Sequence, residues 1–330
     1  MIISKTPYRI SFFGGGSDYP AWYLENGGSV ISTSIDKYCF ISCRPLPNFF
    51  DHNYRIVYSV IENVKNIDEI VHPSVRAILK WKEIKIGLEI HHNGDLPARS
   101  GLGSSSAFSV GLLNALEALN GKIISKKKLS QDAIYIEQEI INENVGSQDQ
   151  IATAYGGFNK IMFNRNNSFD VEKIVIQPHR YKELNDNLLL FFTGTTRYAS
   201  SIAKDQIQNI KNTTSQINAM VDMVDHSINI LHSNETIDEF GKLLHESWLL
   251  KKTLSNKISN TLIDNIYETA LLNGALGGKL LGAGGGGFIL FYVPKNKQKA
   301  VKTALKKFNH VPFSFENQGS SIALYEPNGL

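Results

Sequence analysis

The chain has 330 residues, of which 42% are hydrophobic and 20% charged. This composition excludes a disordered or fibrous protein, and the length favours two domains over one. With 34 basic and 31 acidic side chains the net charge is +3, a mild excess that suits a small anionic substrate at least as well as nucleic acid.

The N-terminal residues MIISKTPYRI lack the charged and apolar regions of a signal peptide. No apolar run approaches the length of a transmembrane helix. We therefore expect a cytoplasmic protein without a membrane partner. Cys39 and Cys43 share one face of a predicted strand, where a disulfide would fit poorly, so we expect a buried and reduced pair.

The stretch RISFFGGGSDYP predicts a strand that ends in a triple-glycine turn. Arg9 lies on the opposite face of this strand from Ile10, and the turn leads to Ser17 and Asp18. A lone strand arginine is usually a surface residue, and an aspartate after a glycine turn usually stabilises the turn. These residues by themselves indicate no particular site.

Alternating apolar residues in IKIGLEI predict a half-buried strand over 84–90. The loop DLPARSGLGSSSA follows, and helical spacing then predicts a helix from Ala107 to Leu119. The serines thus lie at a helix N-terminus, where free amides and the helix dipole favour an anion. A serine cap is the common alternative. Two glycines, and three hydroxyls in place of one, favour phosphate binding.

A second helix is predicted to begin near Ser130, and its apolar stripe contains the carboxylate of Glu137. After Gly146, the stretch SQDQIATAYGG is typical of a new helix, with Ser147 and Gln150 as a capping box. An inward carboxylate such as that of Glu137 needs a cation or a hydrogen-bond donor.

The polar stretch at 164–187 is the predicted domain junction, which gives domains 1–185 and 186–330. Beyond it, NLLLFF predicts a buried strand that ends in TGTTR, and helical patterns cover 196–232 and 236–273. A strand following the glycine-rich stretch, a helix near 297–308 and strands at 313–316 and 322–325 complete the chain. Because helices and strands are intermixed in both halves, we expect an α+β fold.

The glycine-rich stretch fits G-x-G-x-x-G at Gly282, Gly284 and Gly287, but a strand follows it. A dinucleotide-binding turn must instead open a helix, so this interpretation is excluded. The chain also lacks the H-R-D and D-F-G motifs of protein kinases. What remains is a tight structural turn made by Gly282, Gly284, Gly285 and Gly286, needed where backbone approaches backbone or a ligand.

Three of these stretches, in this order, resemble the three motifs of the GHMP kinases: RISFFGGGSDY, PARSGLGSSSA and KLLGAGGGGF. The resemblance covers nearly the whole chain. It implies an N-terminal ATP-binding domain, a C-terminal ferredoxin-like domain, and ATP and Mg²⁺ as cofactors. Within the family, FFGGGSDYP, GSQDQIATAYGG, TGTTR and GGKLLGAGGGG are most similar to members acting on D-glycero-D-manno-heptose 7-phosphate, with those acting on L-fucose next.

The resemblance also implies roles for individual residues. Ser105 and Glu137 would hold Mg²⁺, Asp149 would accept the proton of the sugar's anomeric hydroxyl or orient it, and Arg9 would neutralise charge near the transferred phosphoryl. The ATP phosphates would contact Gly101, Leu102, Gly103, Ser104, Ser105 and Ser106. The substrate would contact Gly15, Gly16, Ser17 and Asp18, with Arg99, Arg197 and Lys279 as candidates for its phosphate that could equally be solvated surface cations.

Galactokinases have Gly-Glu-His-x-Asp where this chain has Gly14-Gly15-Gly16-Ser17-Asp18, which argues against galactose and leaves space for a bulkier or phosphorylated sugar. The resemblance therefore implies phosphorylation of a heptose 7-phosphate to the 1,7-bisphosphate, in nucleotide-heptose synthesis. An L-fucose or other sugar 1-kinase, a non-catalytic sensor of ATP and sugar, and a decarboxylase of the same fold stay open as alternatives. We expect a small-molecule partner and no nucleic acid, and a homodimer stays open.

Overall fold

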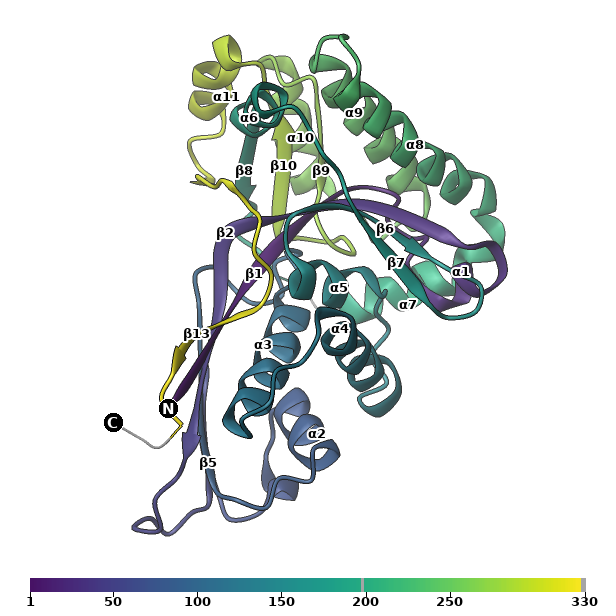
Figure 1. Cartoon of the computed structure of the whole chain (residues 1–330). Helices are drawn as coiled ribbons and strands as arrows, with labels where there is room; N and C mark the ends of the chain where they lie inside the picture. Colours follow the sequence, from purple (N-terminus) through teal and green to yellow (C-terminus); the bar gives the residue numbers. More distant parts are fainter. Residues whose placement is uncertain (197–198, 328–330) are drawn as a thin grey trace.

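The computed structural model describes residues 1–196 and 199–327, so Arg197 lies outside the described residues. The β-strands of this part form two sheets (Figure 1). The first sheet contains β1 (Ile2–Phe13), β2 (Gly28–Pro45), β3 (Tyr54–Val57), β4 (Ile61–Val64), β5 (Leu88–Gly94), β6 (Phe158–Phe163), β7 (Phe169–Lys173), β12 (Phe315–Glu316) and β13 (Ser321–Tyr325). The second contains β8 (Leu188–Phe192), β9 (Gly277–Leu280), β10 (Phe288–Tyr292) and β11 (Asn309–Val311).

The helices connect and cover these sheets. The α-helices are α1 (Pro20–Asn26), α2 (Pro73–Trp81), α3 (Ser104–Leu119), α4 (Lys126–Tyr135), α5 (Gln148–Tyr155), α6 (Pro178–Asp186), α7 (Ala199–Asn209), α8 (Thr214–His232), α9 (Asp238–Thr253), α10 (Thr261–Leu272) and α11 (Gln298–Ala304). Tighter 3₁₀ turns occur at Ile67–Glu69, Ile210–Asn212 and Lys295–Lys297, and a wider π-helical turn at Ile136–Ile140. In residues 1–196 and 199–327, no helix combines the length and apolar character needed to cross a membrane.

Strand β1 positions the site from a place near one side of the first sheet, between β2 and the edge strand β13. It pairs antiparallel with β2 along one edge and with β13 along the other, and helices α3 and α5 contact it. Every residue from Thr6 to Phe13 is consequently buried, including the charged Arg9. Cys39 and Cys43 on β2 are also buried with free thiols, as the sequence predicts.

The second sheet has the ferredoxin-like topology that the resemblance implies. Its strand order is β11-β8-β10-β9, which places the fourth strand beside the first and the third beside the second, with antiparallel pairing throughout. Helices separate β8 from β9 and β10 from β11, which completes a β-α-β-β-α-β arrangement. The expected α+β fold of two parts is confirmed.

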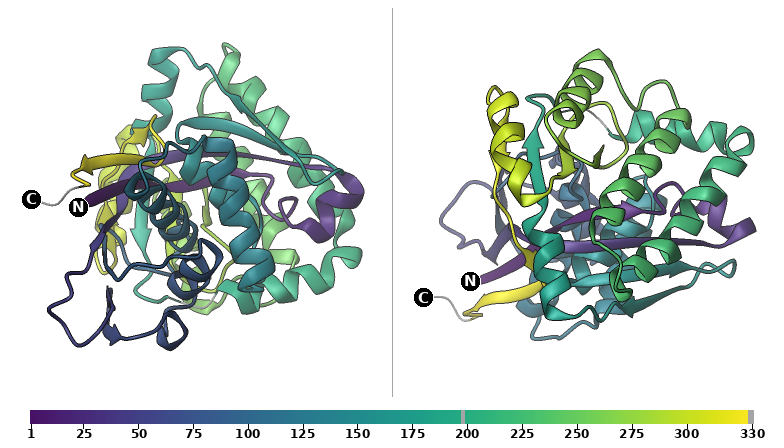
Figure 2. Two further views of the ribbon diagram at one scale, coloured as in Figure 1. Left: turned by 60° about the horizontal axis from the view of Figure 1, so that its bottom comes forward. Right: turned by 90° about the horizontal axis from the view of Figure 1, so that it is seen from above.

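The end of the chain returns to the first sheet. Strand β13 pairs with β1 and β12 pairs with β2, and both views in Figure 2 keep the N-terminal strand beside the C-terminal one. The predicted boundary between residues 185 and 186 thus lies just before β8, where the second sheet begins. The last two strands of the chain, β12 and β13, belong to the first sheet. Sequence patterns cannot predict this return because strand pairing depends on contacts between distant segments.

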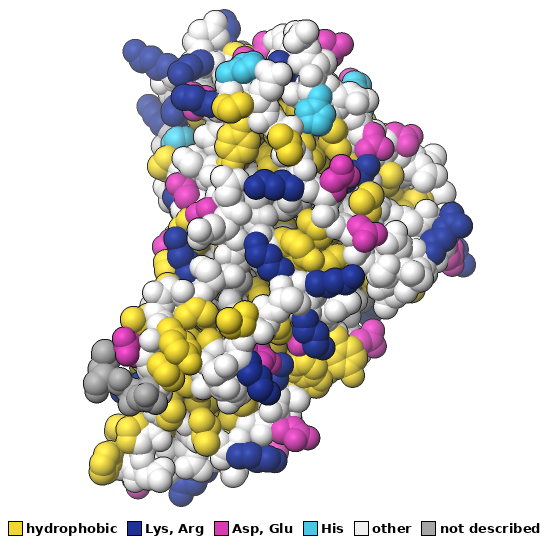
Figure 3. All heavy atoms as spheres, in the orientation of Figure 1, with side chains coloured by type: hydrophobic (Ala, Val, Ile, Leu, Met, Phe, Trp, Pro, Cys, Tyr) yellow, Lys and Arg dark blue, Asp and Glu magenta, His cyan; other side chains and the backbone are white. Residues whose placement is uncertain are grey.

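The surface is mixed in charge, in keeping with the small net charge. On the face in Figure 3, basic side chains are interspersed with acidic and apolar ones, and several basic side chains gather at the top, in the region of α11. The large apolar side chains with high exposure include Phe49, Ile61 and Val71, which lie near strands β3 and β4.

Candidate active site

The loop before α3 is built to receive an anion. Gly103 caps the helix in the left-handed conformation with a φ of 73°, which favours glycine. The Ala107 amide donates to Gly103 O at 2.8 Å, so the amides of residues 104–106 precede the hydrogen-bonded part of the helix. The helix begins three residues earlier than predicted, which places the serines in its first turn, where the helix dipole favours negative charge.

The glycine-rich loop of the second sheet packs against this first loop. A Cβ on Gly101 would lie 2.4 Å from Leu281 O, and one on Gly282 would lie 2.6 Å from the Gly101 Cα. The amide of Phe288 donates to Ser100 O at 3.0 Å. The two loops therefore meet backbone to backbone, at a separation that side chains would prevent.

The other glycines of the loop approach neighbouring segments in the same way. A Cβ on Gly284 would lie 2.7 Å from the Ile258 Cα, and one on Gly286 would lie 2.8 Å from Thr195 Oγ1. The amide of Gly285 donates to Ile258 O at 2.9 Å. The sequence left open whether these glycines allow the backbone to approach other backbone or a ligand. In the structure they allow it to approach other segments of the protein.

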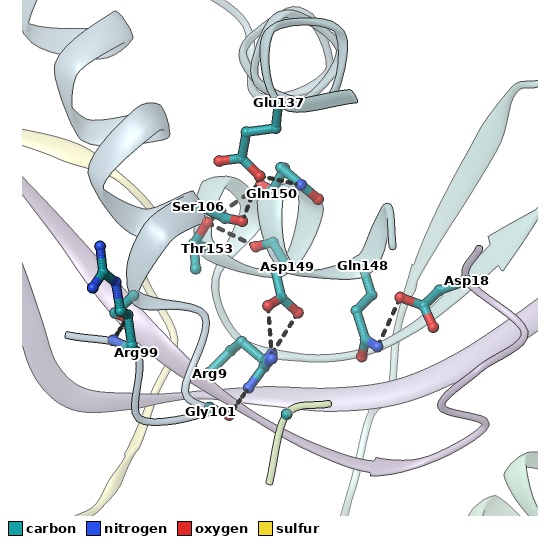
Figure 4. A network of polar contacts seen from close by, with 12 residues as sticks. Arg9, Asp18, Arg99, Gly101, Ser106, Glu137, Gln148, Asp149, Gln150 and Thr153 are labelled. Carbon is teal, nitrogen blue, oxygen red and sulfur yellow. Dashed lines mark hydrogen bonds and ion pairs between the residues drawn. The ribbon is translucent and has the colours of Figure 1, made fainter. Parts of the chain in front are cut away.

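Arg9 connects the first sheet, the anion-binding loop and helix α5 (Figure 4). Its Nε and Nη2 donate to the two carboxylate oxygens of Asp149 at 2.8 and 2.7 Å, and its Nη1 donates to Gly101 O at 2.7 Å. The Arg9 side chain is 3% exposed and that of Asp149 27%. The carboxylate is thus rigidly held yet open on one side, beside the loop that can receive an anion.

Glu137 is buried in the π-helical turn that continues α4, a distortion often found at functional sites. Its Oε2 accepts from Ser106 Oγ at 2.9 Å and from Gln150 Nε2 at 2.5 Å. Its Oε1 is buried and accepts no hydrogen bond of normal geometry among the residues described, although the nearby Ser109 side chain opposes the rise that burial causes in the pKa of Glu137. Burial raises the pKa of Glu137 to about 7, with hydrogen bonds opposing the rise.

The structure lacks one predicted side-chain contact and shows which serine lies against Glu137. Ser106 contacts Glu137, whereas Ser105 is exposed, because the first turn of α3 directs only one of these hydroxyls toward the carboxylate. The predicted capping box is wrong: Ser147 makes no side-chain cap, and the Gln150 side chain reaches Glu137. The buried carboxylate attracts the amide donor more strongly than the helix terminus does.

Asp18 lies close to Asp149 and is buried. It accepts from the Gly16 amide at 3.0 Å and from Gln148 Nε2 at 2.9 Å. A Cβ on Gly146 would lie 1.8 Å from Asp18 Oδ2, so the glycine makes room for the carboxylate. Burial raises the pKa of Asp18, and the nearby charge of Asp149 adds to the rise.

Ser17 differs from its expected role as a substrate contact. Its hydroxyl donates to Gly14 O at 2.8 Å and accepts from the Ser29 amide at 3.1 Å, so the side chain is fully buried and stabilises the turn. Gly15 faces open space instead, because a Cβ there would meet no atom within 4 Å. The open space that the sequence predicts beside this turn is therefore present at Gly15.

Two buried lysines lie behind the site. Lys279 donates to Phe12 O at 2.7 Å, which excludes the surface-cation alternative, and burial lowers its pKa far below the ordinary value. Lys251 donates to Leu280 O at 3.0 Å and to Gly282 O at 2.5 Å, and burial lowers its pKa to about 7. Both lysines connect backbone segments, and Lys251 was not among the predicted residues.

Arg99 is exposed and lies apart from the acceptor-side carboxylates. Its amide donates to Ser104 Oγ at 3.0 Å, and its side chain points away from Asp149 and Asp18 in Figure 4. The structure thus brings Arg9, Asp149 and Asp18 together around one region, with the loop at 101–106 and Glu137 beside it.

Sequence reasoning missed the two glutamines that flank Asp149. Gln148 contacts Asp18 and Gln150 contacts Glu137, so each neighbour of Asp149 contacts another carboxylate of the site. Their position in the stretch GSQDQ, beside the aspartate, is the signal that could have singled them out.

Comparisons with known proteins agree with this geometry. Residues 64–157 match the GHMP kinases N terminal domain, and residues 229–311 match the GHMP kinases C terminal domain. The chain is 30% identical to D-glycero-alpha-D-manno-heptose 7-phosphate kinase of Campylobacter jejuni, over 96% of this chain and 97% of that protein. It is 26% identical to the bifunctional fucokinase/GDP-fucose pyrophosphorylase of Arabidopsis thaliana, over 97% of this chain and 32% of that protein.

Among solved structures, a D-glycero-D-manno-heptose 1-phosphate kinase from Bacteroides thetaiotaomicron has the same fold. The two superpose with a TM-score of 0.74 at 23% identity, covering 99% of this chain and all of that one.

Proposed function

Because this chain belongs to the GHMP kinases, we propose that it transfers the γ-phosphoryl of ATP to the anomeric hydroxyl of D-glycero-D-manno-heptose 7-phosphate, giving the 1,7-bisphosphate and ADP. The chain is a sugar kinase, and kinases of this family use ATP. The observation that carries the proposal is the carboxylate of Asp149, fixed by Arg9 beside the glycine- and serine-rich loop. A heptose 7-phosphate as acceptor would place the protein in nucleotide-heptose synthesis.

The anion-binding loop is the proposed site of the ATP phosphates. Phosphoryl transfer depends mainly on positioning and on stabilisation of charge. The amides and hydroxyls at residues 101–106 supply donors at the positive end of a 16-residue helix. The backbone contact with the glycine-rich loop keeps these donors in place before the nucleotide binds.

Asp149 accepts the proton of the acceptor hydroxyl as that oxygen bonds to the γ-phosphorus and the bond to the ADP oxygen breaks. No covalent enzyme intermediate is needed. An ionised carboxylate has about four lone-pair directions, and Arg9 occupies two of them, so capacity to accept a proton remains. Arg9 also places a fixed positive charge near the transferred group, where negative charge is shared among oxygens.

The residues around Glu137 fit a magnesium ion. The unpartnered Oε1 is a buried oxygen that needs a proton, a donor or a cation, and Ser106 and the more exposed Ser105 supply hydroxyls nearby. Mg²⁺ in such sites takes one or two carboxylates together with substrate phosphates and water. When bound, it neutralises charge on the phosphate oxygens. We therefore assign Glu137 as its carboxylate ligand, with Ser105 or Ser106 as the hydroxyl ligand.

The acceptor side supports a sugar other than galactose. Gly15 leaves open space, and the buried carboxylate of Asp18 is suited to accept from sugar hydroxyls. Gly16 contributes an amide that already binds Asp18, which keeps this carboxylate in place. Of the three cations considered for the sugar's own phosphate, Arg99 stays a candidate, the buried Lys279 does not, and Arg197 is not described.

Phosphorus NMR of the purified protein with ATP, Mg²⁺ and one sugar at a time tests the proposal. The panel contains heptose 7-phosphate, L-fucose, galactose and mannose. We expect an anomeric phosphate signal with heptose 7-phosphate and none with the Asp149→Asn protein, which controls for contaminating kinases. An anomeric signal with another sugar and none with heptose 7-phosphate would overturn the assignment. L-fucose is the second candidate, because the plant fucokinase matches 97% of this chain.

A further inference from the structure

Gln148 lies between the two acceptor-side carboxylates. It is the first residue of α5 and directly precedes Asp149, and its side chain reaches across to Asp18. Figure 4 shows Asp149, Gln148 and Asp18 in a row. The family resemblance assigned no role to Gln148.

The orientation of the Gln148 amide is determined by its partner. Nε2 donates to Asp18 Oδ2 at 2.9 Å, and a carboxylate accepts hydrogen bonds, so it binds the amide nitrogen and turns the amide oxygen away. Asp18 cannot move aside, because the Gly16 amide binds its other oxygen and Gly146 packs closely against it. The position of Gln148 Oε1 is therefore preorganised.

That oxygen has no partner in the ranges that the structure describes. Gln148 Oε1 is buried, whereas buried amide oxygens in native proteins nearly always accept a hydrogen bond. Leaving such an acceptor unpaired is unfavourable. A ligand that brings a donor to this point would remove the penalty on binding.

The chemistry of the two side chains defines the donor. Gln148 Oε1 accepts, and the free lone pairs of Asp18 also accept, so this part of the site is suited to hydroxyl groups. A phosphate or carboxylate would be repelled by Asp18. The acceptor's own phosphate must consequently lie elsewhere, and its polyol edge lies here.

We infer that Gln148 is a specificity-determining residue, which accepts a hydrogen bond from one hydroxyl of the sugar through Oε1 while Asp18 holds its amide nitrogen. This inference rests on the proposed function, since it concerns the acceptor of that same site. It adds a contact on the residue before Asp149, so that recognition of the sugar and placement of the reacting hydroxyl depend on the same turn of α5.

Steady-state kinetics with wild-type protein, Gln148→Leu and Gln148→Met test the inference. The acceptors are heptose 7-phosphate and its monodeoxy analogues. In the wild type, removing the hydroxyl that Gln148 binds should lower kcat/KM by roughly tenfold or more. In both variants that same analogue should react as well as the parent sugar, while the KM for ATP stays unchanged. Using two variants keeps the comparison available if one of them folds poorly.

Gln298→Leu is the matched control. It removes an amide of the same type that donates to Asp186 O at 2.6 Å, at the start of α11 and away from the site. Discrimination among the analogues should then equal that of the wild type. If each deoxy analogue loses the same factor of kcat/KM in the wild type and in the Gln148 variants, the inference is overturned and the proposed function still stands. Failure of the wild type to phosphorylate any sugar would overturn the proposed function together with it.

Discussion

The guanidinium of Arg9 holds the carboxylate of Asp149 through two parallel hydrogen bonds, of 2.8 and 2.7 Å. The two residues are 140 positions apart in the chain, one in strand β1 and the other in the first turn of α5. Such two-point pairing fixes the direction as well as the distance of the carboxylate, which a lysine cannot do. The third donor of Arg9 reaches Gly101 O, so the same side chain aligns the proposed base with the proposed phosphate loop.

Replacing Asp149 with asparagine should lower kcat by roughly two to four orders of magnitude, because the amide oxygen can still accept one Arg9 hydrogen bond but the amide cannot accept a proton. The KM for ATP should change little, and thermal unfolding should show a folded protein. Asp225→Asn is the control, since Asp225 forms an exposed ion pair with Lys160. Turnover of Asp149→Asn near that of the wild type would remove Asp149 from the role of base.

Gly101→Ala should raise the KM for ATP by roughly tenfold or more, because the phosphate loop must shift to relieve the new contact. The Cβ would lie 2.4 Å from Leu281 O, at a φ of 85° that also strains the residue. Gly121→Ala separates the two effects, because Gly121 has a φ of 69° and its Cβ would meet nothing within 4 Å. We expect this control to lose about 1 kcal/mol of stability and to keep its KM for ATP. A similar KM change in both variants would contradict the contact between the loops.

Glu137→Gln should raise the Mg²⁺ concentration needed for half-maximal activity by at least roughly tenfold, since an amide oxygen is a weaker ligand than a carboxylate. Titration of activity with Mg²⁺ at constant ATP measures this. Glu89→Gln is the comparison, because Glu89 is a buried carboxylate that pairs with Arg44 away from the site. Loss of the Glu89 carboxylate should lower the stability of the protein and leave the Mg²⁺ titration unchanged. An unchanged titration for Glu137→Gln would exclude Glu137 as the ligand.

Lys251→Met should cost more stability at pH 9 than at pH 7. Burial, with a contribution from Arg9, lowers the pKa of Lys251 to about 7 from an ordinary value of 10.5. Between these values the unfolded chain binds more protons, so the free energy of unfolding contributed by Lys251 rises with pH. The difference between wild type and variant should therefore grow by up to about 2 kcal/mol from pH 7 to pH 9.

Urea unfolding of both proteins at the two pH values measures this difference. The charged groups that face Lys251 are the same in the wild type and the variant. They are Asp18, Asp149, Arg9 and Lys279. Lys299→Met, at an exposed lysine of α11, should show no such pH dependence. A cost for Lys251→Met that is equal at pH 7 and pH 9 would indicate that the lysine titrates as an exposed group does.

Much of the local structure follows from patterns within short stretches. The helix at 104–119 and the buried strand at 188–192 were predicted closely, because apolar spacing and turn residues depend on near neighbours. The first helix turn, the inward carboxylate of Glu137 and the glycine turns could be recognised for the same reason. Motif order then indicated the family, which the comparisons confirm.

The tertiary structure decided which of these residues meet. The sequence alone determined a glycine- and serine-rich helix start, three candidate carboxylates and an α+β pattern. Packing of distant segments decided that Ser106, rather than Ser105, faces Glu137, that Lys279 is buried, and that the last strands rejoin the first sheet. Side-chain direction and strand partners depend on contacts across the fold, and local periodicity carries no information about them.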